Sequence, residues 1–112
     1  MKYFMVTWQT RDEHNFSGDC DLIDKFQNAP QATSSFYNKR ALDDDVVQIA
    51  QSCTFLKSAL PNMCFFRTTD ETLTENAVAT WLTQLFGATL CYGRHIYIKQ
   101  VFDPYPVVQL NL

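Results

Sequence analysis

Apolar and polar residues alternate near the start of the chain, where Phe4, Val6 and Trp8 share one face of residues 2–10. Alternation of this kind, rich in aromatic residues, is typical of a half-buried β-strand. Residues 63–68 form a short apolar run between turn-forming residues. This run is too short for a helix and predicts a buried second strand.

Two further strand patterns, 89–92 and 95–102, flank Gly93 and Arg94. A glycine in this position suits the tight turn of a hairpin, although one long strand with a glycine bulge fits the same residues. Residues 107–112 end the chain with a last alternating pattern. They predict a final strand behind the stiff segment around Pro104 and Pro106.

Three stretches carry apolar residues at helical spacing. The first covers about residues 20–28, with Ser17 or Asp19 as its N-terminal cap. The second follows three aspartates and runs over 46–60, where Pro61 stops it. Each of these stretches therefore predicts an amphipathic helix.

The third helical stretch follows a capping box of Thr72 and Glu75 and is closed by Gly87. Its apolar stripe consists of Val78, Trp81, Leu82, Leu85 and Phe86. We expect this helix to belong to the core, with the Trp81 side chain buried between the others.

Strands and helices mixed in this order favour an α+β fold. We predict one globular domain over residues 1–112, a two-layer sandwich in which about three helices cover a largely antiparallel sheet. A ferredoxin-like variant with an additional helix is the nearest named architecture.

The composition of the chain argues against several classes of protein. The chain has a net charge of −3, and its nine basic residues are scattered. Binding to phosphate backbones needs clustered Lys and Arg, so a nucleic acid is not the expected partner. The first eight residues are too short an apolar run for a signal peptide, and no stretch approaches a membrane span. We therefore expect a cytoplasmic protein without membrane contact.

The four cysteines, Cys20, Cys53, Cys64 and Cys91, are far apart and form no CxxC pair. Without a secretion signal they predict reduced thiols rather than disulfides. Cys91 and His95 have a spacing seen in zinc sites, but Gly93 interrupts their strand. We favour buried thiols that act as small apolar residues.

An acidic loop over residues 12–21 is a further candidate metal site. Asp12, Glu13 and Asp19 offer oxygen ligands for a hard cation, although their spacing misses the calcium-loop pattern. Carboxylates at a helix start also have a purely structural use, so we favour a solvated loop with a helix cap. No glycine-rich phosphate loop or serine-nucleophile motif occurs, and no cofactor is expected.

Two segments are candidate protein contacts. Asp43, Asp44 and Asp45 precede a helix, where they complement its dipole and could also face a basic partner. In the tail we expect contacts by Tyr105, Val108 and Leu110, because an extended segment can add a strand to a sheet edge of another chain or of its own domain.

The sheet pattern also contains aromatic residues that could stack on single-stranded nucleic acid. They are Tyr3, Trp8, Phe65, Tyr92, Tyr97 and Phe102. Stacking platforms combine such rings with basic side chains, and residues 94–99 lack the RNA-recognition signature. We expect most of these rings to be core.

In outline, the strand at 3–8, the run 65–70 that leads into a capped helix and the strand at 95–101 resemble small Cas2-like ferredoxin-fold proteins. The similarity covers about half of the chain and no specific motif. It implies a homodimer and, as in some members, metal-dependent nuclease activity at an Asp directly after the first strand. Here the acid is displaced to Asp12, and the helix expected at 43–60 has no counterpart.

The observations together favour a non-catalytic protein-binding module, a small acidic regulator or inhibitor of a host protein complex of the kind that mobile genetic elements encode. The alternative is a metal-dependent nuclease or nucleic-acid-associated protein of Cas2-like ferredoxin fold, with Asp12, Glu13 or Asp19 at the cation.

Overall fold

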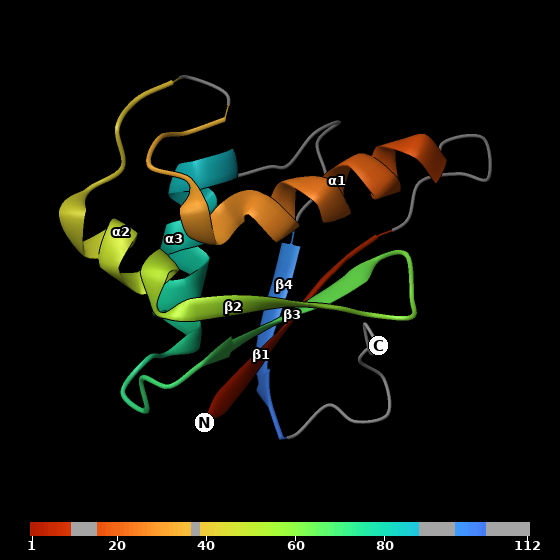
Figure 1. The fold of residues 1–112 in the computed structure, drawn as a ribbon. Helices are drawn as coiled ribbons and strands as arrows, with labels where there is room; N and C mark the ends of the chain where they lie inside the picture. Colours follow the sequence, from red (N-terminus) through yellow and green to blue (C-terminus); the bar gives the residue numbers. More distant parts are fainter. Residues whose placement is uncertain (10–15, 37–38, 88–95, 103–112) are drawn as a thin grey trace.

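The computed structural model describes residues 1–9, 16–36, 39–87 and 96–102, and for residues 16–21 it describes the backbone alone. The elements follow one another as β1 (Lys2–Trp8), α1 (Phe16–Asn28), the short 3-10 turn η2 (Ala29–Gln31), α2 (Asp44–Gln51), β2 (Cys53–Lys57), β3 (Met63–Thr68), α3 (Glu75–Phe86) and β4 (Ile96–Val101) (Figure 1).

The four strands form one sheet in the order β2-β3-β1-β4, and every neighbouring pair is antiparallel. Consecutive strands such as β1 and β2 are therefore separated in space, while β2 and β3 form a hairpin. The three helices lie to one side of the sheet (Figure 1). The predicted α+β class with an antiparallel sheet and about three helices is confirmed.

The core lies between the helices and one face of the sheet. Phe4, Val6 and Trp8 point into it, as their alternation predicted, and all three are buried. Phe26 of α1 packs at its centre, with its ring centroid 5.2 Å from Trp8 and 4.9 Å from Phe86. Aromatic side chains bury large apolar areas, so these contacts hold α1 and α3 against the sheet.

The third helix behaves as its apolar stripe indicated. All five stripe residues are buried, and Trp81 is fully enclosed with its ring centroid 4.9 Å from that of Phe66 on β3. The helix begins differently from the prediction, because its N-cap is Thr74, whose hydroxyl oxygen accepts a hydrogen bond of 3.2 Å from the backbone N–H of Ala77. The proposed capping box of Thr72 and Glu75 is wrong, since Thr72 bonds to Asp70 instead.

The prediction of one helix over 46–60 is wrong. The α2 helix ends at Gln51, and residues 53–57 form the edge strand β2. The helix stops at Ser52, whose hydroxyl donates a hydrogen bond of 2.7 Å to the carbonyl of Ile49. The β-branched Thr54 and the aromatic Phe55 then favour an extended backbone. A short apolar run fits both periods, so spacing alone did not separate helix from strand.

Smaller differences concern the ends of elements. Helix α1 begins at Phe16, so Ser17 and Asp19 lie within it and do not precede it. The strand predicted over 63–68 agrees with β3, and β4 confirms the strand predicted over 95–102. The expected strands at 89–92 and 107–112 lie outside the described residues.

Candidate functional site

Most residues that the sequence nominated for chemistry or binding lie where the structure gives no side chain. Asp12, Glu13, Tyr105, Val108 and Leu110 fall outside the described residues, and Asp19 belongs to the part of α1 that has only its backbone described. Their roles stay predictions.

The three aspartates at the start of α2 are described and have different environments. Asp43 has the extended backbone of an N-cap residue, but its side chain makes no cap bond. Its Oδ2 atom instead accepts a hydrogen bond of 2.9 Å from Nε2 of Gln84 on α3. Asp45 accepts a hydrogen bond of 3.0 Å from the backbone N–H of Val46. Asp44 is exposed, and its side chain has neither hydrogen bond nor ion pair within the described residues.

A cavity of about 400 Å³ opens beside these acids, between the segment that leads into α2 and the C-terminal end of α3. Among the described residues its walls include Arg40, Asp43 and Gln84, together with Ser35, Ala41, Leu42, Thr83 and Gly87. The walls therefore combine a guanidinium, a carboxylate and an amide with small side chains.

The chain around Ser35 shapes one side of this cavity. The carbonyl of Leu85 accepts hydrogen bonds from the Ser35 hydroxyl at 3.2 Å and from the backbone N–H of Phe36 at 2.9 Å. Carbonyls in the last turn of a helix have no partner within the helix, so these two donors cap the end of α3. A backbone hydrogen bond of 2.8 Å from Ser35 to Arg40 closes the same loop.

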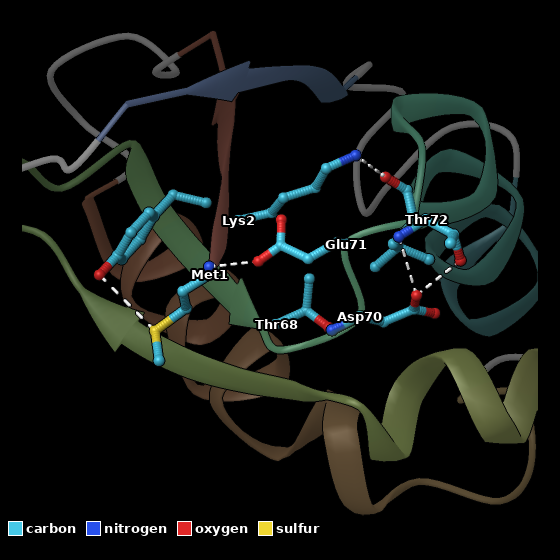
Figure 2. Close-up of polar contacts among 8 residues, drawn as sticks. Met1, Lys2, Thr68, Asp70, Glu71 and Thr72 are labelled. Carbon is cyan, nitrogen blue, oxygen red and sulfur yellow. Dashed lines mark hydrogen bonds and ion pairs between the residues drawn. The ribbon is translucent and has the colours of Figure 1, made fainter.

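A second polar group lies where β3 leads into α3 (Figure 2). Asp70 accepts hydrogen bonds from the backbone N–H of Thr72 at 2.9 Å and from its hydroxyl at 2.6 Å. These bonds favour the carboxylate and lower the pKa of Asp70. The N-terminal ammonium pairs with Glu71, and the Lys2 ammonium donates to the carbonyl of Leu73 at 2.9 Å. This group anchors β1 to the loop and so stabilises the fold.

The described thiols are placed for packing. Cys53 and Cys64 are free and buried, in agreement with the interpretation of small apolar residues. Burial raises the pKa of Cys53 from 9.0 to about 11, with a smaller contribution from the charge of Asp70, and burial raises the pKa of Cys64 as well. Both thiols therefore stay protonated at neutral pH, which disfavours a nucleophilic role.

No group of three or more His, Cys, Asp or Glu residues that could hold a metal ion occurs within the described residues. Among the same residues, no helix combines the length and apolar character that a membrane crossing requires.

The sheet has a second face, opposite the helices, which we call the outer face. It carries Tyr3 and Met5 from β1, Leu56 from β2, Phe65 and Arg67 from β3, and Tyr97 and Lys99 from β4.

Fewer aromatic side chains of the sheet are buried than the sequence led us to expect. Trp8 and Phe65 are buried, but Tyr97 is 56% exposed and Phe102 is 96% exposed. Phe65 also lies outside the core between the sheet and the helices, so the expectation that most of the rings are core is wrong for Phe65, Tyr97 and Phe102. Tyr92 lies outside the described residues.

Comparison with protein-family models, with curated proteins and with solved structures finds no match to this chain.

Proposed function

We propose that this chain is a non-catalytic protein-binding module, a small acidic regulator or inhibitor of a host protein complex. The observation that carries the proposal is the exposed carboxylate of Asp44, which has no partner within the described residues and lies next to a residue that lines the 400 Å³ cavity. A surface carboxylate that no internal contact uses is available to a partner, and the cavity offers space for a side chain of that partner.

The negative charge at the start of α2 favours a basic partner. Asp44 and Asp45 lie together at the exposed start of α2. Carboxylates grouped in this way attract a positively charged surface and accelerate association at low salt. The proposed contact therefore combines electrostatic attraction with the cavity beside Asp43.

The test compares three forms of the chain as baits in a cell lysate: the natural sequence, Asp44→Asn with Asp45→Asn, and Asp24→Asn. Asp24 is an exposed acid on α1 and provides the matched control. We expect one stoichiometric partner whose recovery falls with the double variant and with added salt, and stays unchanged with Asp24→Asn. Equal recovery with all three forms, or no stoichiometric partner, would contradict the proposal.

A ferredoxin-like variant is our proposal for the finer fold class. The strand order β2-β3-β1-β4, with all neighbours antiparallel, supports it, and α2 is then an insertion before β2. A homodimer is part of the same hypothesis. Mass measurement in solution tests the dimer directly, because a monomer at all concentrations would exclude it.

The same strand order also supports the alternative of a metal-dependent nuclease of Cas2-like fold. Incubation with single- and double-stranded nucleic acids in the presence of Mg²⁺ or Mn²⁺ tests this alternative. Cleavage that disappears when Asp12, Glu13 and Asp19 are all replaced by Ala would favour the nuclease over the binding module. Cleavage unchanged by these substitutions would exclude this site.

A further inference from the structure

The fold separates the charges of this chain. The four described strands contain Lys2, Lys57, Arg67 and Lys99, which are four of the nine basic residues, and none of the twelve acidic residues. The net charge of −3, from which the sequence argued against a nucleic-acid partner, averages over the whole chain. A binding surface responds to the charges near it, so the sheet has to be judged by its own residues.

Two of these cations, Arg67 of β3 and Lys99 of β4, lie on the outer face of the sheet. The Lys99 side chain is exposed and the Arg67 side chain is half-buried. Neither side chain has a hydrogen bond or an ion pair within the described residues. Cationic groups that no internal contact uses are available to an anionic ligand.

Tyr97 supplies an exposed aromatic ring beside these cations. It lies on β4 two residues before Lys99, on the same face and about 7 Å away at about 3.4 Å per residue. The Tyr97 side chain is 56% exposed and has no ring contact within the described residues. Surfaces that bind single-stranded nucleic acids combine such rings, on which bases stack, with cations that contact the phosphates.

A hollow of about 480 Å³ lies beside the Tyr97 ring, at the end of β1. Among the described residues its walls include Thr7, Gln9 and Asn62, together with Trp8. The register places Thr7 directly opposite Tyr97, and Nδ2 of Asn62 donates a hydrogen bond of 3.0 Å to the carbonyl of Trp8. A hydroxyl and two side-chain amides provide both donors and acceptors for the edge of a base that stacks on Tyr97.

We propose that the outer face binds single-stranded nucleic acid, with a base on the Tyr97 ring and phosphates at Lys99 and Arg67. The two cations are two strands apart and two residues apart along the sheet, a distance of about 12 Å, so one short oligonucleotide can contact both. An acidic protein segment would use the cations alone, whereas unpaired bases also use the ring and the amides of the hollow. This surface does not depend on the acidic residues at α2.

Fluorescence anisotropy with a labelled oligothymidine of about 12 nucleotides, measured at low salt and without divalent cations, tests the proposal. We expect saturable binding that weakens as the salt concentration rises. A duplex of the same length should bind more weakly, because its bases already stack on one another. No saturable binding, or a duplex that binds as tightly, would overturn the proposal. Polyglutamate that competes as well as unlabelled oligothymidine would also overturn it and assign the face to acidic proteins.

Variants of the full chain locate the binding surface. Tyr97→Ala should weaken binding about 5- to 150-fold, the usual contribution of one stacked base, whereas Tyr97→Phe should stay within about twofold of the natural sequence. Lys99→Gln should weaken binding and reduce its salt dependence.

Lys57→Gln is the matched control for the charge. Lys57 is also an exposed lysine of the sheet, but it shares the core side of β2 with Phe55. We expect this variant to bind like the natural sequence, and melting curves verify that every variant is folded. Equal weakening by Lys57→Gln and Lys99→Gln, or an unchanged affinity of Tyr97→Ala, would contradict the proposed surface.

Discussion

Gln84 of α3 donates a hydrogen bond of 2.9 Å to Asp43, the residue directly before α2, although 41 positions separate the two in the chain. This bond ties the start of one helix to the end of the other. It also separates the three aspartates by role, because Asp43 serves the fold while Asp44 faces solvent without an internal partner among the described residues.

Replacing Asp43 and replacing Asp44 should therefore have different consequences. We expect Asp43→Ala to lower the free energy of unfolding by about 1 kcal/mol, the usual contribution of one such hydrogen bond. Asp44→Ala should change stability by less than about 0.5 kcal/mol, as is usual for a surface substitution. Urea denaturation measures both values. Gln84→Ala is the control, since it should reproduce the loss seen with Asp43→Ala and add little to it in the double variant.

The indole nitrogen of Trp81 is buried without a hydrogen-bond partner among the described residues. Trp81→Ala should cost about 3 to 5 kcal/mol, because it opens a cavity beside Phe66. Trp81→Phe keeps an aromatic ring and removes the unpaired donor, so we expect a loss of no more than about 2 kcal/mol. Thermal unfolding compares the two variants. If both variants lost the same free energy of unfolding, the indole N–H would have a hydrogen-bond partner in the folded protein, and Trp81→Phe would remove that bond as well.

The buried thiols should resist alkylation in the folded protein. At pH 8 both Cys53 and Cys64 are protonated, because burial raises their pKa values, that of Cys53 to about 11. We expect iodoacetamide to modify these two sites only after unfolding, as peptide mapping would show. Rapid modification of either site in the native protein would contradict the described burial.

The raised pKa of Cys53 makes the free energy of unfolding depend on pH in the alkaline range. In the unfolded chain the Cys53 thiol ionises near its ordinary pKa of 9.0, whereas in the folded protein it keeps its proton up to about pH 11. The folded state then binds more protons than the unfolded state, so the free energy of unfolding should fall as pH rises from about 9 to about 11. Cys53→Ala should reduce this slope in urea titrations at several pH values.

Glu75 at the start of α3 accepts a hydrogen bond of 2.6 Å from the backbone N–H of Gln100 in β4. An N–H group that points away from the neighbouring strand β1 is a site at which another chain could pair. We expect Glu75→Ala to accelerate hydrogen exchange at the Gln100 amide, and Glu75→Gln, which keeps an acceptor, to do so much less. Glu71→Ala serves as the control and should leave this amide unchanged.

Local signals in the sequence determined several elements well. The alternation of Phe4, Val6 and Trp8 identified β1 and its buried face, and the stripe around Trp81 identified α3 together with its core residues. These predictions succeeded because each element has one apolar face, and that face sets a clear period along the chain. The free state and burial of Cys53 and Cys64 were also expected from their spacing and their apolar surroundings.

Other features were decided only by the tertiary structure. Residues 53–57 fit a helical period, yet pairing with β3 made them a strand, because the backbone groups that face β3 gained partners in the sheet. No local pattern could indicate that Asp43 bonds to Gln84, or that Leu85 is capped from Ser35, since such contacts depend on how α2 and α3 pack together. The burial of Phe65 on the outer face belongs to the same class. The apolar period of an element can be recognised in the sequence, but the contacts that each of its faces makes depend on how the elements pack together.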